Sequence, residues 1–391
     1  MASDFSMLPV DLLGVIALKL ETFEDFFEFS AVCRSWNRAS SSVKHQWTAT
    51  PIVPWLLLAE NNQDNPDCVR KIFNLSNNKC YKFSLPETFG ARCWGTSYGW
   101  IAMIDRNLDV QLFNPITKAQ IPFPSLKPPR TYFNPRSGES YQNWFLDSSA
   151  DKVIVLKVPQ NDHYEFVVML VRQHCYSVAI ARHGDQWWTS VSIKSKGRML
   201  DVVEIDDNIL ALYNDGSIVS LNVKEFNALE HIKPVDYSPC GHELFVKFNR
   251  GHVYHTYLVR SGSDLLAVLR YREQVGNEKD DDDIFCQTID FEVYRFRTVD
   301  KSWEEIDDLG EVALVVGRNS SMCVSVGHTN GLQRNCIYFT DDYHLFWGSV
   351  REPGGHDTGV FDFESGDIWP FYEGDDIHSI FSPPTLFIPQ F

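Results

Sequence analysis

The sequence predicts a mainly β protein with a small α-helical domain at its N-terminus, and three observations lead to this fold class. Apolar residues recur at helical spacing between residues 8 and 47, and this periodicity largely stops afterwards. After Trp47, short β-rich segments alternate with turns containing Gly, Asn, Asp and Pro, and several of these segments look alike. Aromatic residues make up 14% of the chain and include eleven Trp, which favours strands.

The helical domain is expected to contain three short helices. The first follows Pro9 and has apolar residues at three- and four-residue spacing: Leu12, Leu13, Ile16 and Leu20. Thr22 is a typical N-cap for the second helix, and the third runs from Val32 to Trp47. Together these helices carry more apolar side chains than so small a core can bury. We therefore expect another protein to cover part of them.

The order of the motifs in this stretch resembles the F-box. The matching pieces are LP (8–9), DLL (11–13), Ile16 with Leu20, and VCRSW (32–36). F-box families use this domain to dock a substrate receptor onto the Skp-type adaptor, and through it a cullin, in SCF ubiquitin ligases. The resemblance implies these adaptor-binding residues: Leu8, Pro9, Leu12, Leu13, Ile16, Leu20, Val32, Cys33 and Trp36. Trp36 would also hold the helices together.

One segment departs from the F-box pattern. FEDFFEF (23–29) is richer in Phe than the leucine-rich middle helix that the family usually has. An alternative that needs no partner is that all of these residues form only a local three-helix core.

Five segments after the helices share one pattern, in which an apolar strand, a polar turn and a return strand follow one another. They are 110–123, 178–191, 217–232, 292–306 and 359–371. In three of them a Trp opens the return strand: Trp188, Trp303 and Trp369. A single hairpin cannot bury its own faces, and radial stacking of blades around an axis solves that problem. We therefore predict one β-propeller over 49–391 after a helical domain over 4–48, with a pair of β-sandwich-like modules as the alternative.

Short motifs in the second domain resemble the kelch-like, propeller-type C-terminal domain of a large plant F-box family. They are PWLLLAE (54–60), CYKFSLPE (80–87), RCWGTSYGWIAMID (92–105) and IYFTDDY (337–343). The sequence leaves the number of blades open. From topology alone, the first strand, near 53–59, is expected to complete the last blade and so close the ring.

Composition restricts the partners and the compartment. The net charge of −17 disfavours nucleic acid or an anionic membrane as a partner, because such binding needs Lys and Arg. No run approaches the ~20 apolar residues that span a bilayer. The start MASDFSM lacks the basic region of an export signal, and the nine Cys form no C-x-x-C, so we expect an intracellular protein of the nucleus, the cytoplasm or both. We expect neither a cofactor nor a metal, since no nucleotide motif and no tetrahedral ligand set is found.

GTSYG (95–99) matches the G-x-S-x-G pattern of hydrolase nucleophiles, which requires a strand before the serine and a helix after it. The residues after Ser97 are β-like instead, and the two glycines fit a tight turn. We therefore interpret Ser97 as a turn residue and expect no catalytic residue in the chain.

The leading hypothesis is a non-catalytic substrate receptor of an SCF-type, cullin-RING E3 ubiquitin ligase. Its propeller would hold an unknown target protein near the ubiquitin-charged enzyme. The segment 127–144 supplies the candidate target-binding residues Arg130, Tyr132 and Tyr141, because Arg and Tyr dominate binding hot spots. Two alternatives stay open: a propeller enzyme acting on a small molecule or glycan, and an adaptor-binding scaffold without a role in degradation.

Overall fold

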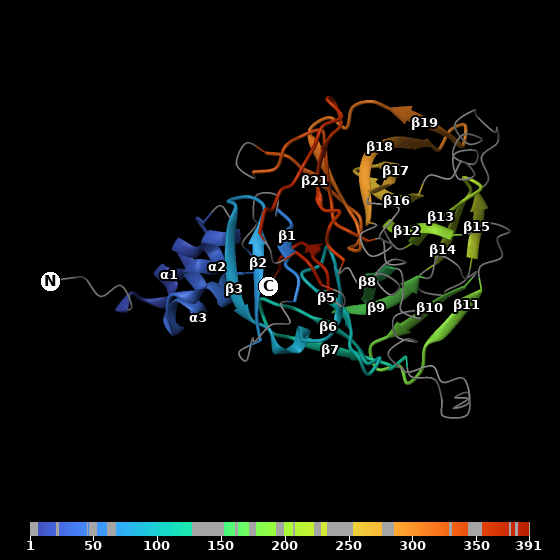
Figure 1. The fold of residues 1–391 in the computed structure, drawn as a ribbon. Helices are drawn as coiled ribbons and strands as arrows, with labels where there is room; N and C mark the ends of the chain where they lie inside the picture. Colours follow the sequence, from blue (N-terminus) through green and yellow to red (C-terminus); the bar gives the residue numbers. More distant parts are fainter. Residues whose placement is uncertain are drawn as a thin grey trace.

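The protein is described by a computed structural model covering residues 7–20, 23–44, 46, 53–60, 68–126, 152–160, 163–171, 177–192, 199–205, 208–222, 228–232, 253–275, 285–327, 331–342, 354–374, 377–379 and 382–390. Within these residues the chain forms a small helical domain followed by six β-sheets arranged as a ring (Figure 1). The fold class predicted from the sequence, three N-terminal helices followed by a β-propeller, is confirmed. Among the helices of the described residues, none combines the length and the hydropathy of a membrane-spanning segment.

The helical domain consists of α1 (Val10–Ala17), α2 (Phe23–Ala31) and α3 (Arg34–Val43). Its core is small and is made by the sides of the helices that face one another. The buried members are Leu13, Ala17, Phe26, Phe29 and Ala39. The half-buried Trp36 packs onto this core, with its ring 4.3 Å from that of Phe29.

The six sheets are numbered here as blades in chain order. Their strand orders are as follows: blade 1, β25 (Thr385–Phe387), β1 (Trp55–Leu57), β2 (Val69–Asn74), β3 (Lys79–Ser84); blade 2, β4 (Arg92–Gly95), β5 (Ile101–Ile104), β6 (Val110–Phe113), β7 (Gln120–Phe123); blade 3, β8 (Lys152–Gln160), β9 (His163–Val171), β10 (Ser177–Arg182), β11 (Thr189–Ser192); blade 4, β12 (Met199–Ile205), β13 (Asn208–Tyr213), β14 (Ile218–Asn222), β15 (Ala228–Ile232); blade 5, β16 (Val253–Ser261), β17 (Asp264–Val275), β18 (Phe285–Arg297), β19 (Ser302–Ile306); blade 6, β21 (Met322–Ser325), β20 (Val312–Val316), β22 (Cys336–Phe339), β23 (Gly359–Asp362), β24 (Ile368–Trp369). A short 3-10 turn, Pro86–Thr88, leads from blade 1 to blade 2. The first-named strands approach one another across neighbouring blades, as β25 does to β4 and β12 to β16, and so form the centre of the ring.

The apolar cores of the ring lie between neighbouring blades. One cluster of buried side chains fills each gap, from blades 1 and 2 around to blades 6 and 1. Strand β8 shows how the sequence does this, because Val153 and Val155 point to blade 2 whereas Ile154 and Leu156 point to blade 4. A strand buried on both faces is therefore a continuous apolar run. A closed cycle of cores is the arrangement of a propeller and excludes the alternative of two sandwiches.

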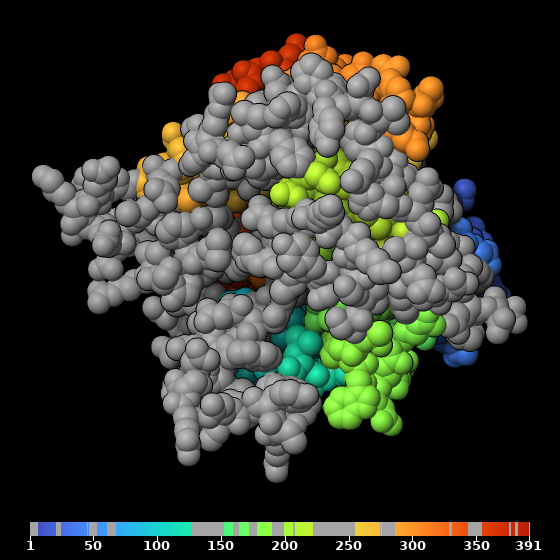
Figure 2. Space-filling model, turned by 90° about the vertical axis from the view of Figure 1, so that its right-hand side faces the viewer, coloured from blue at the N-terminus to red at the C-terminus, as the bar shows by residue number. Residues whose placement is uncertain are grey.

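The five hairpins predicted from the sequence are all present. Each supplies two successive strands of one blade: β6–β7, β10–β11, β14–β15, β18–β19 and β23–β24. A sixth pair, β2–β3, completes the series in blade 1 and was not recognised as a repeat. In Figure 2, from the side opposite the helices, parts of blades 2 and 3 lie side by side and the helical domain shows only at the edge.

The expected closure of the ring is wrong in one respect. The first strand does pair with a strand near the C-terminus, with Trp55 opposite Phe387 and Leu57 opposite Thr385. However, β1 joins β2 and β3 in blade 1, and β25 is the strand added to them. Gly95 of β4 permits this arrangement, because a Cβ at that position would lie 1.9 Å from the carbonyl oxygen of Leu386. The physical reason is the number of strands, since the five strands β20 to β24 that precede β25 already fill blade 6.

Candidate functional site

Helix α1 buries one side, and five apolar residues along it and at its C-terminal end are exposed. Leu13 and Ala17 are buried, and a Cβ on Gly14 would lie 3.2 Å from Val43, so α1 lies close against α3. The exposed strip consists of Val10, Leu12, Val15, Ile16 and Leu18. We call these five residues the apolar strip of α1. Apolar side chains gathered on one short helix are typical of a surface that binds another protein.

A second exposed apolar residue lies in the turn between α2 and α3. Val32 is 60% exposed, and its amide donates a hydrogen bond to the carbonyl oxygen of Phe29 over 3.3 Å. Cys33, the N-cap residue of α3, is extended and half-buried, and its Sγ lies 3.1 Å from the Ser35 hydroxyl. The turn is thus held by local bonds that leave Val32 accessible.

The residues predicted to bind an adaptor fall into three groups. Pro9, Leu12, Ile16 and Val32 are exposed. Leu8, Leu20, Cys33 and Trp36 are half-buried, and three of them, Leu8, Leu20 and Trp36, pack against the helical core. Leu13 requires a correction: its side chain is fully buried in that core and offers no surface to a partner. The side of α1 that faces α3 takes Leu13 inward, because Leu13 and Ala17 are one turn apart.

Three residues of the apolar strip were missed by sequence reasoning: Val10, Val15 and Leu18. The signal was present, since LLGVIAL (12–18) is apolar around the whole helix rather than on one side. A short helix that is apolar all round and lies at a protein surface must expose some of these residues.

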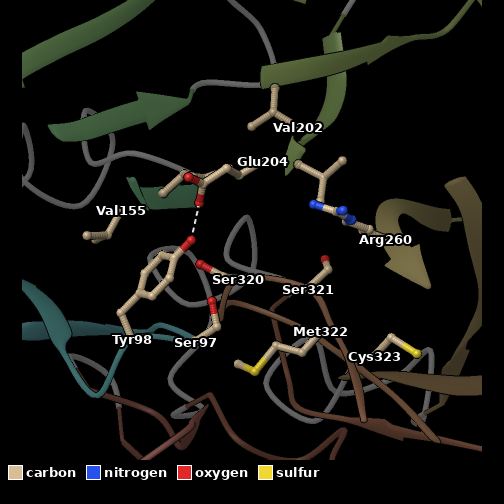
Figure 3. Close-up of a pocket in the computed structure, with 12 residues that line it drawn as sticks. Ser97, Tyr98, Val155, Val202, Glu204, Arg260, Ser320, Ser321, Met322 and Cys323 are labelled. Carbon is tan, nitrogen blue, oxygen red and sulfur yellow. Dashed lines mark hydrogen bonds between the residues drawn. The ribbon is translucent and has the colours of Figure 1, made fainter. Parts of the chain in front are cut away.

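The centre of the propeller contains a cavity of about 260 Å³. Side chains from five blades line it: Ser97, Tyr98, Ile154, Val155, Val202, Val203, Glu204, Arg260, Ser320, Ser321, Met322 and Cys323. In Figure 3, Tyr98 and Glu204 lie on one side of this cavity and Arg260 reaches in from the other. The inner strands of neighbouring blades bring these residues together, although they are spread over more than two hundred positions of the chain.

Tyr98 and Glu204 form a hydrogen-bonded pair in this cavity. The phenol of Tyr98 donates a hydrogen bond to Oε2 of Glu204. Burial of the ring and the nearby carboxylate raise the pKa of Tyr98, and Arg260 acts in the opposite direction. The phenol therefore stays protonated and holds the carboxylate in place. Among the described residues that line the cavity, Glu204 is the only carboxylate, so they do not supply the paired acids that a glycoside hydrolase needs.

A buried ion pair lies beside the cavity and fixes one of its walls. Lys152 Nζ lies 2.7 Å from Asp201 Oδ1 and donates a further hydrogen bond to the hydroxyl of Ser321 over 3.0 Å. The amide of Leu258 donates to Asp201 Oδ2 over 2.8 Å. These bonds join blades 3, 4, 5 and 6, so the cavity has a rigid frame.

The interpretation of Ser97 as a turn residue is confirmed. It lies between β4 and β5, in a turn where the amide of Thr96 donates to the carbonyl oxygen of Trp100 over 3.1 Å. Gly99 has a φ of +79°, which a glycine adopts without strain. A strand follows, where a nucleophile elbow would have a helix.

Two further expectations concern the target-binding residues in segment 127–144 and the lack of a metal site. Arg130, Tyr132 and Tyr141 lie outside the described residues, so their role stays a prediction. Across the described ranges, no group of three or more His, Cys, Asp or Glu could hold a metal ion.

Comparison with known proteins gives two family matches. Residues 5–47 match the F-box domain, and residues 72–362 match the KIB1-4 β-propeller. The chain is also similar to curated proteins of Arabidopsis thaliana over nearly its whole length. F-box protein SKIP23 is 25% identical, over 98% of this chain and 95% of the relative. F-box protein KIB3 is 24% identical, over 98% and 82%, and F-box/kelch-repeat protein KIB1 is 24% identical, over 92% and 83%.

The two matches coincide with the two parts of the structure. The F-box match covers the three helices, and the propeller match runs from within β2 to the end of β23. Proteins that combine an F-box with this propeller are typically non-catalytic. The F-box domain implies binding to a Skp-type adaptor. The chain therefore belongs to the F-box proteins that carry a KIB1-4 β-propeller.

Proposed function

We propose that this chain is the substrate-recognition subunit of an SCF-type E3 ubiquitin ligase, acting inside the cell. The observation that carries the proposal is the apolar strip of α1, with Leu12 and Val15 each 54% exposed on a helix of eight residues. Covering each aliphatic side chain of the strip contributes roughly 1 kcal/mol, about half the value for a fully exposed one. A Skp-type adaptor, which the F-box domain implies, is the partner that this surface fits.

The mechanism is proximity. The helical domain would bind the adaptor and through it a cullin, while the propeller holds a target protein near the ubiquitin-charged enzyme. Ubiquitin transfer then becomes effectively intramolecular, and no side chain of this chain forms or breaks a bond.

For the target we propose contact at the mouth of the central cavity. Tyr98, Glu204 and Arg260 place a phenol, a carboxylate and a guanidinium in one concave site on a rigid frame. Tyr and Arg are the residue types that contribute most at protein interfaces. Arg130, Tyr132 and Tyr141 are kept as a second proposal for the target contact.

The adaptor half is tested by co-purification of the full chain with a Skp-type adaptor. We expect a stoichiometric complex with the wild type and its loss in Leu12→Asp and in Ile16→Asp, which place a carboxylate in the apolar strip. Val299→Asp is the matched control, since Val299 is 95% exposed in the turn before β19. A wild-type chain that does not bind the adaptor would refute the proposed function.

The target half needs a separate measurement. Proteins captured by the wild-type propeller and lost with both Arg260→Ala and Glu204→Gln are candidate targets. A target whose level rises when the apolar strip is mutated supports the receptor. A level that does not change favours the adaptor-binding scaffold instead.

A further inference from the structure

The three described phenylalanine side chains of α2 pack against two different cores. Phe26 and Phe29 are 1% and 6% exposed and lie in the helical core, as residues three positions apart on one side of a helix do. Phe27 is about 100° around the helix from Phe26 and faces away from that core. It packs instead against the buried cluster shared by blades 1 and 2.

Phe27 contacts a cluster of aromatic side chains on blade 1. Its ring centroid lies 6.3 Å from that of Trp55 in β1, with the planes at 89°, and 5.9 Å from that of Phe83 in β3. Trp55 is fully buried and stacks on Tyr81 at 5.4 Å with nearly parallel planes. Figure 1 shows the same arrangement at the level of the fold, with the helices beside β2 and β3 at the rim of the ring.

This contact has the features of a specific anchor. Edge-to-face and tilted aromatic pairs are directional, so the contact favours one orientation of α2 on the blade. Trp55 cannot move to follow the helix, because it is fully buried and β1 is paired on both sides, with β2 and β25. The chain between the end of α3 at Val43 and the start of β1 at Trp55 is short, which keeps the two aromatic surfaces at high effective concentration.

We infer that Phe27 is a positioning residue that anchors the F-box helices to blade 1, so that helical domain and propeller move as one body. This explains why FEDFFEF departs from a leucine-rich helix: Phe26 and Phe29 build the helical core, and Phe27 adds an aromatic contact to a neighbouring domain. For the receptor role, on which this consequence rests, a fixed angle would hold a target at one distance from the adaptor.

Small-angle X-ray scattering of the full chain alone tests the anchor without any adaptor, so its failure is separate from failure of the proposed function. We expect Phe27→Asp to keep the wild-type circular dichroism but to show a larger maximum dimension and a curve that no single rigid shape fits. Phe27→Leu should restore most of the compact curve. Ser41→Asp, which adds the same charge at an exposed position of α3, is the control and should match the wild type.

Phe83→Ala makes the same test from the propeller side and leaves the helical core untouched. If Phe27→Asp unfolds the helices, Phe83→Ala becomes the variant that tests the anchor. Expansion of the Phe83→Ala chain with its folding intact supports the anchor. If Phe27→Asp and Phe83→Ala stay folded and their scattering curves superimpose on that of the wild type, the anchor is refuted.

Discussion

Trp303 in blade 5 donates a hydrogen bond from its indole Nε1 to the carbonyl oxygen of Gly216 in blade 4, over 3.1 Å. Trp188 makes the equivalent bond from blade 3 to Pro124, just after the last strand of blade 2, over 2.8 Å. In both cases the indole leaves its own sheet and bonds to the preceding blade. Two of the three Trp that open a return strand, Trp188 and Trp303, therefore link neighbouring blades.

Replacing Trp303 should destabilise the propeller through two separable effects. Trp303→Ala removes a ring that is 2% exposed and packs on Phe296, and should cost about 3–5 kcal/mol of unfolding free energy. Trp303→Phe keeps most of the packing but leaves the Gly216 carbonyl without its donor, a loss of about 1–3 kcal/mol. Chemical denaturation followed by circular dichroism measures both. Equal losses for the two variants would mean that the hydrogen bond, not the packing, carries the whole effect.

The buried acid Asp357 should matter far more than a surface acid. Its Oδ2 lies 2.8 Å from Arg270 and 2.9 Å from Arg272, and its Oδ1 accepts from the amide of Thr288 over 2.9 Å. Asp357→Ala would leave two buried guanidinium groups short of an acceptor and should cost about 3–5 kcal/mol in a urea titration.

The matched control for Asp357 is Glu311, which pairs with Arg334 over 3.2 Å at the surface. Because water screens that pair, Glu311→Ala should change the unfolding free energy by less than about 1 kcal/mol. A similar loss for both acids would contradict a special role for the buried network.

The stability of the chain should fall as the pH falls from about 6.5 to about 4, with His255 as one cause. Burial lowers the pKa of His255 to about 4, against the opposing effect of Asp342, whose Oδ2 lies 3.7 Å from Nδ1. In the unfolded chain the pKa is near 6.5. Between these values the unfolded state binds the proton and the folded state does not, so the contribution is lost on acidification, up to roughly 3 kcal/mol.

The variant His255→Phe, which can still stack on Tyr257, should flatten this part of the pH profile. His183 is exposed, so His183→Phe should leave the slope as it is in the wild type. Unfolding free energies measured at half-unit pH steps distinguish the two. A wild-type slope that survives in His255→Phe would assign it to other groups.

Trp36→Ala should weaken the F-box helices less than a buried tryptophan would suggest. The ring is half-buried and meets Phe29 at 4.3 Å, so the expected loss is roughly 1–3 kcal/mol rather than the value for full burial. Hydrogen exchange of residues 8–46 reports this loss locally. Trp187→Ala, at a position that is 72% exposed, should leave exchange in the helices unaltered.

The sequence was informative where a pattern is local. The hairpin over 292–306 combines alternation, a polar turn and a returning Trp within fifteen residues, so its strands could be predicted. The blade number could not, because inner strands such as β8 are apolar on both faces and show no alternation that separates them from a buried helix segment. Leu13 illustrates the same limit in α1, where neighbouring apolar residues differ in exposure but not in type.

The central cavity could not be predicted for a different reason. Tyr98, Glu204 and Arg260 lie in three different blades and meet because the ring closes around them. Nothing in the residues next to each one in sequence distinguishes it from an ordinary strand-end polar residue. Sites built by closure of a ring depend on contacts between distant segments, which spacing along the chain does not encode.

Because β25 completes blade 1, the ring can close only after the last strand of the chain has been synthesised. The F-box helices and the strands β1 to β3 leave the ribosome early, but blade 1 waits for Thr385–Phe387 before its innermost strand is present. A nascent or prematurely terminated chain would thus display finished F-box helices beside an open ring. Because Phe27 rests on Trp55, next to the strand that arrives late, completion of the ring and firm seating of the helices should come together.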